Sequence, residues 1–437
     1  MITAPSTNQQ RALIAAVQVL ALCVWFSATA VVPSLRTEWG IGSTAAVWLT
    51  ASVQIGFVAG AVTSTLFNLA DRIAPQYLLA ASAFGAAVCT ALLALFVNDL
   101  SAAIPLRFLT GLLLAGVYPV GMKLMASWSE STDRGRAFGV LLGALTLGSA
   151  LPHLISGLGP LPWRTVMMAA AVLTAIGALI AVLLITSGPH LDTRPITPNP
   201  RYAITMFRER GPRLANIGYF GHMWELYALW TWMSMFVLAG REQRGTGPVT
   251  TTTTTTSIIA FAAIGLAGIA GCLLGGWASD RFGRSPAAVT ALVISGACCV
   301  LSPLFFTTPT GVLLAFLLVW GAAVIADSGV FSTSLSETAD SRFIGTALTA
   351  QTAIGFLLTV VTIQLVPVTA DLTGWRYAFL LLAPGPLIGA VAMVALRAHT
   401  TPATNSQHSS KEEHHAQHLD SPHPDSWPDR GDLPHRR

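Results

Sequence analysis

The sequence is poor in charged residues. Only 10% of its 437 residues are Asp, Glu, Lys or Arg, whereas 53% are hydrophobic. A typical soluble domain contains about 25% charged residues, so a soluble fold of this size would lack the side chains needed to cover its surface. The composition therefore predicts a membrane protein. Its formal net charge of +4 is too small to indicate nucleic-acid binding.

The sequence also lacks the motifs of enzymes and metal centres. HExxH, GxSxG and Walker loops are absent, and a membrane-embedded enzyme would need a metal or nucleophile cluster of that kind. The five cysteines fall in apolar runs without CxxC spacing, so neither a disulfide framework nor a zinc site is indicated. We therefore expect no enzymatic activity and no cofactor.

Long apolar runs dominate what is present. A hydrocarbon core about 30 Å thick requires roughly 20 apolar residues in a helix, and runs of that length recur between charges and Pro or Gly. Twelve such runs are Ala12–Leu35, Ala45–Leu69, Gln76–Val97, Ala102–Met125, Ala137–Leu158, Arg164–Thr186, Leu214–Ala239, Ser257–Ala278, Pro286–Phe306, Gly311–Thr333, Phe343–Val366 and Tyr377–Leu396. They predict an all-α membrane protein with twelve transmembrane helices.

Basic residues gather in alternate loops between these spans. If the N-terminus is cytoplasmic, the cytoplasmic loops contain Arg72, Lys123, Arg134, Arg136, Arg194, Arg201, Arg208, Arg210, Arg213, Arg281, Arg284 and Arg342. The opposite loops contain only Arg36, Arg164, Arg241, Arg244 and Arg376. Because positive charge favours the cytoplasmic side, we expect an integral, multi-pass protein of the cell membrane with both termini in the cytoplasm.

The first span has a second interpretation. Arg11, the apolar run after it and Ala28-Thr-Ala30 together imitate a cleavable signal peptide. Cleavage there would leave eleven spans and would place the Arg-rich loops outside the cell. The apolar run continues to Leu35, which favours a span that is retained.

A polar segment at residues 187–213 divides the spans into six and six and is predicted to be a cytoplasmic linker. Asp71-Arg72 recurs as Asp280-Arg281 at an offset of 209, and Trp163-Arg164 recurs as Trp375-Arg376 at an offset of 212. We expect two pseudo-symmetric six-helix bundles around a midplane site. The predicted segments are a cytoplasmic N-terminal segment at 1–11, bundles at 12–186 and 214–396, the linker, and a tail at 397–437.

Two segments are low in complexity. Thr250–Thr256 is a run of seven threonines on the non-cytoplasmic side, and we interpret it as a tolerated loop repeat. The tail holds seven of the ten histidines. Histidine clusters can bind metals, but this Pro- and charge-rich composition favours a disordered tail without a metal site.

One loop carries a nine-residue motif. Gly276-Trp-Ala-Ser-Asp280-Arg281-Phe-Gly283-Arg284 lies between the eighth and ninth spans and resembles the signature loop of the major facilitator superfamily at every key position. In addition, Arg107-Phe-Leu-Thr-Gly111 is similar to the fourth-helix motif of that family. The resemblance covers residues 12–396 and implies the fold of this family and transport by alternating access.

The resemblance also implies a gate. Glycines permit a tight turn and close helix approach, Asp280 can face a helix N-terminus, and Arg281 and Arg284 can pair with carboxylates or headgroups. The related first-half loop keeps Asp71 and Arg72 but departs from the family pattern at Phe67, Ala74 and Pro75. We expect these contacts to hold the cytoplasmic side closed. The alternative is a loop that only anchors the orientation.

Few ionisable side chains lie well inside the spans. A charge at the bilayer centre costs roughly 3 kcal/mol on the insertion scale, so the functional candidates are Arg107, Glu225, Asp327, His153 and His222. Desolvation favours the neutral form of a carboxylate, so Glu225 or Asp327 could carry a proton, with Arg107 as the opposing charge. For each candidate the alternative is a buried structural role.

Further residues are spaced so that they share one face of a predicted helix. Gly218, His222 and Glu225 share one face of the seventh span, and Ser149, His153 and Ser156 form a polar stripe in the fifth. The aromatic residues of the seventh span either line a cavity or form an interface belt; they are Trp224, Tyr227, Trp230 and Trp232.

The identity of the substrate stays open. His222-Met-Trp-Glu-Leu-Tyr227 and Asp327-Ser are loosely similar to bacterial members grouped with nitrate/nitrite or cyanate porters, but residues 45–69 and 257–278 lack the arginines that nitrate porters use. A drug/proton antiporter would have Gly-Pro where Pro152-His153 stands. We expect proton-coupled symport or antiport of a small solute by a monomer surrounded by lipid. The alternatives are an uncoupled anion uniporter or exchanger, a channel, or a transporter-like sensor.

Overall fold

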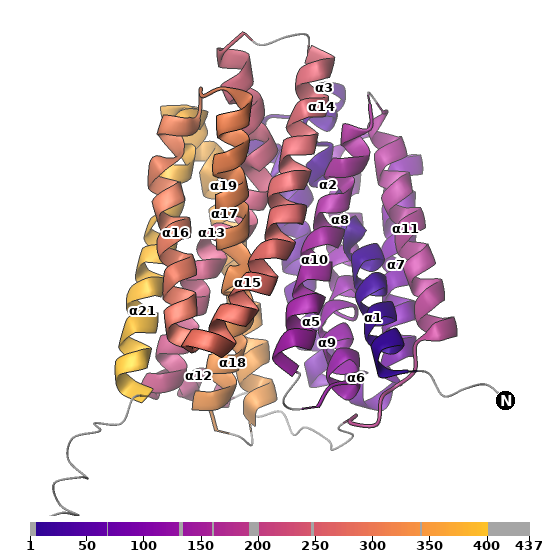
Figure 1. The fold of residues 1–437 in the computed structure, drawn as a ribbon. Helices are drawn as coiled ribbons and strands as arrows, with labels where there is room; N and C mark the ends of the chain where they lie inside the picture. Colours follow the sequence, from indigo (N-terminus) through magenta and orange to yellow (C-terminus); the bar gives the residue numbers. More distant parts are fainter. Residues whose placement is uncertain are drawn as a thin grey trace, which may run out of the picture. The chain divides into compact units, whose positions relative to one another are not determined.

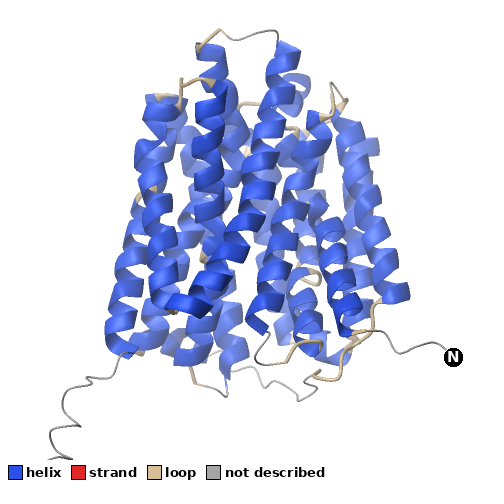
Figure 2. Ribbon diagram, viewed as in Figure 1, coloured by secondary structure: helices blue, strands red, loops and turns tan. Residues whose placement is uncertain are grey.

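The computed structural model describes residues 6–67, 69–130, 134–159, 161–191, 201–245, 249–340 and 343–400, and these ranges contain helices and no strand (Figures 1 and 2). The chain divides into two units, Met1–Leu396 and Arg397–Arg437. The predicted His-rich tail from residue 401 onward lies outside the described residues, as do residues 192–200 of the predicted linker.

The N-terminal half comprises the first six predicted spans. Its elements are α1 (Thr7–Ala21), η1 (Leu22–Val24), α2 (Ser27–Ala30), α3 (Val32–Trp39), α4 (Ser43–Ala46), α5 (Trp48–Leu66), α6 (Leu69–Arg72), α7 (Pro75–Phe96), α8 (Leu100–Leu114), α9 (Tyr118–Ser127), α10 (Arg134–Gly157) and α11 (Trp163–Leu184). In Figure 1 this half is indigo to magenta and stands beside the orange and yellow helices of the other half.

The C-terminal half follows two short elements, α12 (Tyr202–Thr205) and η2 (Met206–Arg208). It consists of α13 (Arg210–Gln243), α14 (Val249–Ala260), the π-helical η3 (Phe261–Leu266), α15 (Ala267–Phe282), α16 (Arg284–Phe305), α17 (Thr310–Ala326), α18 (Ser328–Thr338), α19 (Ile344–Thr373), α20 (Trp375–Ala378), η5 (Phe379–Leu382) and α21 (Pro384–Thr400).

All twelve predicted spans coincide with helices, which confirms the all-α membrane fold. Ten helical stretches of the described residues are long and apolar enough to cross a membrane. The first span differs because it is broken into four short helices, and the seventh differs because α13 places polar residues such as Asn216, His222 and Glu225 among its apolar ones. The segment Ala28-Thr-Ala30, which imitates a signal-peptide cleavage site, is the buried helix α2.

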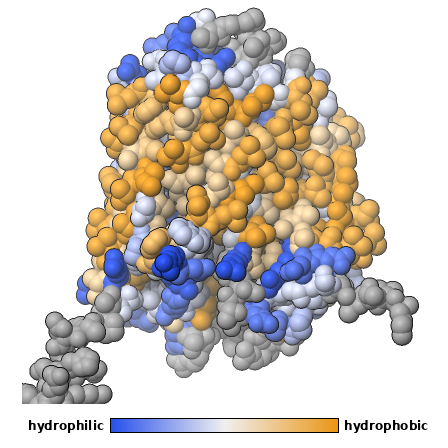
Figure 3. Space-filling view, in the orientation of Figure 1, coloured by the Kyte–Doolittle hydropathy of each residue, from blue (hydrophilic) through white to orange (hydrophobic). Residues whose placement is uncertain are grey.

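The surface has an apolar belt. Large side chains such as Phe96, Leu183 and Val391 are each more than 60% exposed. On the face shown in Figure 3 such residues form a continuous band between two more polar ends. An exposed apolar surface of this extent indicates contact with another apolar phase, and its placement across the helices fits the hydrocarbon core of a bilayer.

Small residues let helices approach closely, as the sequence predicts. Gly56 of α5 faces the main chain of Phe108 in α8, and Gly271 of α15 faces the Ala322 carbonyl in α17, with no room for a Cβ atom at either glycine. Close backbone approach stabilises helix pairs where lipid removes the hydrophobic drive to associate. The α5–α8 and α15–α17 pairs occupy equivalent places in the two halves.

Helix breaks repeat with the same spacing as the sequence motifs. The fourth span is interrupted at Ala115–Val117, between α8 and α9, and the tenth is interrupted at Asp327, between α17 and α18. The offset from Val117 to Asp327 is 210 residues, between the motif offsets of 209 and 212. The internal repeat therefore extends from sequence to backbone geometry.

The threonine run is helical, so its interpretation as a loop is wrong. The helix α14 begins at Val249 and contains the run. Near its other end, Ile258 packs against Gly157 of α10. Threonine has a modest helix propensity, but tertiary packing overrides such a preference.

The two halves touch along their whole length. At the end that carries α6, α12 and the turn at Gly283, which we call the signature-loop end, Thr65 of α5 lies 3.3 Å from Thr349 of α19 between the two hydroxyl oxygens. Midway, Gly143 of α10 packs against Ile269 of α15. At the opposite end, Gly157 meets Ile258. The structure is therefore one in which neither end is widely open.

Candidate functional site

Arg107 is fully buried in α8 and is held by uncharged acceptors. Its Nε donates to the Leu49 carbonyl at 3.0 Å, one terminal nitrogen donates to the Val24 carbonyl at 3.0 Å, and the other donates to the Trp25 carbonyl. Val24 and Trp25 lie where the first span breaks, so their carbonyls face the guanidinium instead of continuing a helix. The negative end of the α1–η1 helix offsets the positive charge.

A second side chain, from the first span, binds the main chain where the fourth span is interrupted. Gln18 of α1 donates from Nε2 to the Val117 carbonyl at 3.1 Å, where the fourth span is interrupted. Arg107 of the fourth span thus binds the break in the first, and Gln18 of the first binds the break in the fourth. We call this pair of contacts the reciprocal brace. It satisfies main-chain carbonyls that would be costly to leave unpaired in a membrane.

Asp327 and His222 form a buried pair. Asp327 lies at the break between α17 and α18, and its Oδ1 is 2.9 Å from Nδ1 of His222 on α13. By distance this is an ion pair when His222 is protonated, but the groups are not aligned as a hydrogen bond, so Oδ1 has no donor within the described residues. The other ring nitrogen, Nε2, is 2.9 Å from Oγ of Ser328.

Glu225 belongs to a separate network inside the C-terminal half. The carboxylate accepts from Ser295 Oγ at 2.5 Å, Trp320 Nε1 at 2.6 Å and Cys299 Sγ at 3.3 Å. Its three donors are neutral and come from α16 and α17. Arg107, in the other half, bonds to main-chain carbonyls, so the structure does not bring the arginine and the two carboxylates together.

His153 lies at the boundary between the halves. It is buried in α10, and Nδ1 lies 3.5 Å from Oγ of Ser234 on α13. Its Nε2 has no hydrogen-bond partner within the described residues, and neither does the hydroxyl of Ser156 one turn later. The polar stripe predicted for the fifth span therefore faces the other half with unused polar atoms.

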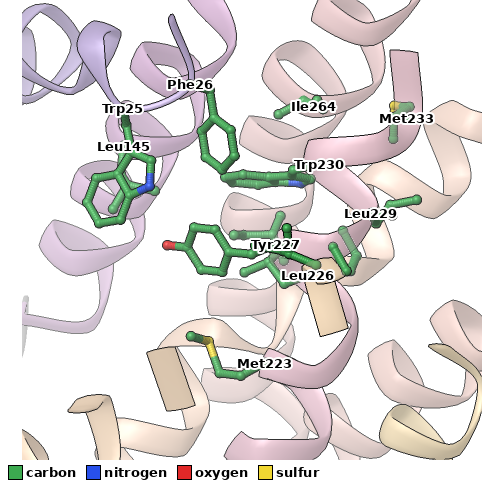
Figure 4. Close-up of a cluster of buried hydrophobic side chains, with 14 of the residues drawn as sticks. Trp25, Phe26, Leu145, Met223, Leu226, Tyr227, Leu229, Trp230, Met233 and Ile264 are labelled. Carbon is green, nitrogen blue, oxygen red and sulfur yellow. The ribbon is translucent and has the colours of Figure 1, made fainter. Parts of the chain in front are cut away.

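Six aromatic rings meet between the halves, and we call them the six-ring cluster. Trp25, Phe26 and Phe57 come from the N-terminal half, and Tyr227, Trp230 and Phe356 come from the C-terminal half. Figure 4 shows Phe26 standing over Trp230 while the Tyr227 hydroxyl points toward the N-terminal half. Five ring contacts cross the boundary, with centroids 4.6 to 6.1 Å apart.

These contacts have an energetic consequence. An aromatic pair contributes about 0.5–1.5 kcal/mol beyond its buried area, so five pairs hold the halves together by about 3–7 kcal/mol on that scale. Separation of the halves therefore requires something else to cover the ring faces.

The cluster also contains polar atoms without partners. Nε1 of Trp25, Nε1 of Trp230 and both amide atoms of Gln54 are buried and make no hydrogen bond within the described residues. Gln54 lies one turn before Phe57 on α5. Each unpaired buried group costs about 1–3 kcal/mol, so a bound molecule that supplied hydrogen-bond partners here would be stabilised. On α19, Gln351 is buried in the same way with both amide atoms unpaired.

The aromatic residues predicted for the seventh span separate into two groups. Tyr227 and Trp230 belong to the six-ring cluster, where they pack against rings of the N-terminal half. Trp224 donates to the Leu381 carbonyl at 3.0 Å and Trp232 donates to the Ile363 carbonyl at 2.8 Å. These two indoles bind helices of their own half and do not form a membrane-interface belt.

The signature loop is assembled as a turn with one ion pair. Gly283 adopts φ +92° between α15 and α16, which only glycine tolerates easily. Arg284 binds Glu337 of α18, with Nε 2.8 Å and a terminal nitrogen 2.7 Å from Oε1. Glu337 is not among the residues predicted from the sequence. Gly276 has open space around it, and the close helix approach expected there is made by Gly275 against the Ala326 carbonyl.

Asp280 and Arg284 line a pocket between the halves. Phe138 and Gly139, in the first two turns of α10, lie on its other wall. Asp280 and the N-terminal part of α10 thus border the same pocket. Arg281 and Arg72 are exposed at the same end. The side chain of Asp71 lies outside the described residues.

No three His, Cys, Asp or Glu side chains converge on one point in the described residues. That part of the chain therefore offers no metal centre. The five cysteines are free and buried.

Comparison with known families gives one extended match. Residues 14–363 and 251–429 match the family model described as Major Facilitator Superfamily. The two matched ranges overlap and together cover both six-helix halves.

Two curated relatives match over part of the chain. A Bacillus subtilis (strain 168) protein provisionally named a niacin/nicotinamide transporter is 31% identical over 161 residues, which is 36% of this chain and 38% of that protein. The staphyloferrin B transporter of Staphylococcus aureus (strain NCTC 8325 / PS 47) is 28% identical over 152 residues, or 33% of this chain and 36% of the relative. The chain thus spans little more than a third of the length of these relatives.

Solved structures share the fold over nearly the whole chain. The xylose transporter XylE of E. coli, in a partially occluded inward-open conformation, has a TM-score of 0.67 at 14% identity and covers 90% of this chain and 98% of its own. A mutant of the nucleoside transporter NupG has a TM-score of 0.68 at 15% identity and covers 89% and 99%. At this level of identity the likeness establishes the fold.

Proposed function

Since this chain belongs to the Major Facilitator Superfamily, we propose that it carries a small organic solute across the membrane by alternating access, with proton coupling. Family membership makes it a membrane transporter and not an enzyme. The proposal adds where the solute binds, which groups couple it to protons, and the orientation expected from the arginines, with both termini cytoplasmic in the cell membrane. We further propose that the monomer is the working unit.

The six-ring cluster carries the proposal. It lies between the halves, where alternating access requires the solute site, and its indole N–H groups and the neighbouring Gln54 amide have no partner within the described residues. A solute that accepts and donates hydrogen bonds would complete these groups. The same solute would replace the ring contacts that are lost when the halves separate.

The names of the relatives support an organic solute. The curated relatives are named for niacin/nicotinamide and for staphyloferrin B, and the structural neighbours are named for xylose and nucleosides. None of these names concerns nitrate, nitrite or cyanate. An anion exchanger that binds its substrate through Arg107 is also less well supported, because the guanidinium donates to main-chain carbonyls.

Proton coupling is proposed for Asp327 and His222. One face of α13 places Tyr227, Trp230 and Ser234 against the N-terminal half, and the other places His222 beside Asp327. A shift of α13 when solute binds would therefore change the distance within the pair. Because the two side chains are close but not aligned, a small rotation would make or break a hydrogen bond between them, and we propose that this change accompanies proton transport.

Flux in proteoliposomes tests the coupling. The first solute to try is radiolabelled nicotinamide, followed by any compound that raises the melting temperature of the purified protein. Asp327→Asn should abolish accumulation driven by a pH gradient while leaving exchange at equal solute concentrations largely intact. Glu225→Gln should reduce accumulation less, because the three donors of Glu225 can still bind a neutral amide oxygen.

Asp371→Asn is the matched control, since this carboxylate is exposed near the far end of α19. Full gradient-driven accumulation by the Asp327 variant would show that the pair is structural and would leave a uniporter or an exchanger as the function.

A further inference from the structure

We infer that the solute is a planar, uncharged aromatic or heteroaromatic molecule bearing a carboxamide-like group, and that it binds among the rings of the six-ring cluster. This inference rests on the proposed transport function and names the class of solute. It follows from ring geometry, from the placement of charges and from the unpaired polar atoms, each taken in turn below.

Ring geometry favours a flat solute. Tyr227 lies nearly parallel to Phe26, with an interplanar angle of 16° and centroids 5.9 Å apart, and it stacks on Trp25 at 27° and 6.1 Å. Both pairs join one half to the other. When the halves separate, each exposes ring faces, and a planar ring between them restores stacking on both sides at the spacing that aromatic pairs prefer. A saturated ring of the same volume does not.

Charge placement favours an uncharged solute. Arg107 donates to three main-chain carbonyls and to Ser27 Oγ. Glu225 is bound by Ser295, Trp320 and Cys299, and Asp327 lies beside His222 on the other face of α13. These three charged groups are thus already engaged by other parts of the protein. A carboxylate or ammonium group on the solute would be buried in the cluster without a counter-charge, which is strongly unfavourable.

The unpaired atoms select the polar group. The indole N–H groups of Trp25 and Trp230 can only donate, so the solute must supply acceptors. The Gln54 amide, also unpaired, can donate and accept at once. A carboxamide can accept from an indole N–H group through its carbonyl oxygen and can both donate to and accept from an amide such as that of Gln54, whereas a hydrocarbon ring would leave such groups unsatisfied.

Four probe molecules test separately whether the solute must be planar, uncharged and aromatic. Equilibrium binding to the full-length protein in lipid nanodiscs, at one pH and without a gradient, is measured for benzamide, cyclohexanecarboxamide, benzoate and xylose. Cyclohexanecarboxamide removes planarity, benzoate adds charge, and xylose is uncharged and polar but not aromatic. Benzamide should bind at least about tenfold more tightly than each of the others, which corresponds to a single well-placed interaction.

Variants locate the binding. Trp25→Phe and Trp230→Phe keep a ring and delete the N–H group, so each should weaken benzamide binding by about three- to tenfold. Tyr77→Phe is the control because it also keeps a ring and deletes one polar group, and Tyr77 is more than half exposed on α7. This variant should bind benzamide as the wild type does. Melting temperatures verify that all three variants are folded.

The outcomes distinguish this inference from the proposed function. Equal binding of benzamide and cyclohexanecarboxamide, preference for benzoate or xylose, or unchanged binding in both cluster variants would each overturn the inference, even if gradient-driven transport of another solute is observed. Conversely, benzamide binding with the predicted selectivity but without pH-driven flux would contradict the proposed proton coupling and would support the inferred class of solute.

Discussion

Arg107 shows how a membrane interior can hold a cation without an acid. Its planar guanidinium reaches acceptors in three directions, and the acceptors are carbonyls of Val24, Trp25 and Leu49. A lysine ammonium is a compact point charge and cannot span the same positions. The arginine therefore fixes the main chain from which Trp25 and Phe26 project into the six-ring cluster, and its role is one of positioning.

Replacement of Arg107 should cost stability as well as transport. Arg107→Met leaves the Val24 and Trp25 carbonyls unpaired, which should destabilise the protein by about 2–4 kcal/mol. Arg107→Lys should fall between Met and wild type. Thermal unfolding in detergent measures the order of stability among the wild type, Arg107→Lys and Arg107→Met. Arg397→Met, at the end of α21, is the control. If Arg107→Lys matches the wild type in melting temperature and flux, the three-way contact is not needed.

The sequence identified Arg107 because charges are rare inside apolar runs. It could not identify the partners of Arg107, since main-chain carbonyls occur at every residue and leave no pattern. It also passed over Gln54 and Gln351, whose neutral amides attract less notice than a carboxylate. A glutamine within an apolar run is nevertheless a usable signal, because an amide in a membrane requires hydrogen-bond partners as well.

At the scale of helices, glycine position decides which pairs can pack. Each of the twelve predicted spans agrees with the observed helices to within eight residues at either end, but the sequence did not reveal the breaks at Trp25, Ala115–Val117 and Asp327. Prolines were an uneven guide: Pro119 stands in the first turn of α9, directly after the break at Ala115–Val117, whereas Pro105 and Pro367 lie inside continuous helices. Breaks depend on side chains from other spans, such as those of the reciprocal brace, and a single apolar run does not encode them.

Two glycines five residues apart in α15 should respond oppositely to the same change. Gly276→Ala adds a Cβ in open space and should raise stability by about 0.5–1 kcal/mol, the usual helix gain. Gly271→Ala places the Cβ against the Ala322 carbonyl, so α15 and α17 must separate and stability should fall. The melting temperatures of the two variants test this prediction. A rise in both would mean that α15 and α17 can accommodate a Cβ atom at position 271 without separating.

At the scale of the whole membrane unit, the proposed gate would join one half to the other. Asp280 borders the same pocket as Phe138 and Gly139 of α10, whereas Arg284 binds Glu337 within its own half. Asp280→Asn should leave the melting temperature nearly unchanged, because an exposed charge contributes little to stability. It should slow transport about tenfold, as loss of one charge–dipole contact of about 1 kcal/mol or more would do. Normal flux would favour the anchoring role instead.

Orientation is testable without knowledge of the solute. A reporter that is active only outside the cytoplasm should be silent when fused after Arg437 and active when inserted near Gly245, because arginine-rich loops remain in the cytoplasm. A cytoplasmic reporter at the same two sites should give the reverse pattern. An active external reporter at the C-terminus would overturn the twelve-span topology.

The unpaired indoles of Trp25 and Trp230 finally imply an asymmetry in kinetics. An empty carrier must pass through a closed form in which both N–H groups lack partners, whereas a loaded carrier passes through it with those groups satisfied. If one such group costs about 1.4 kcal/mol more in the empty passage, the loaded step is about tenfold faster. Solute placed on the far side should therefore accelerate uptake of label, and Trp25→Phe combined with Trp230→Phe should erase that trans-stimulation while leaving net flux in place.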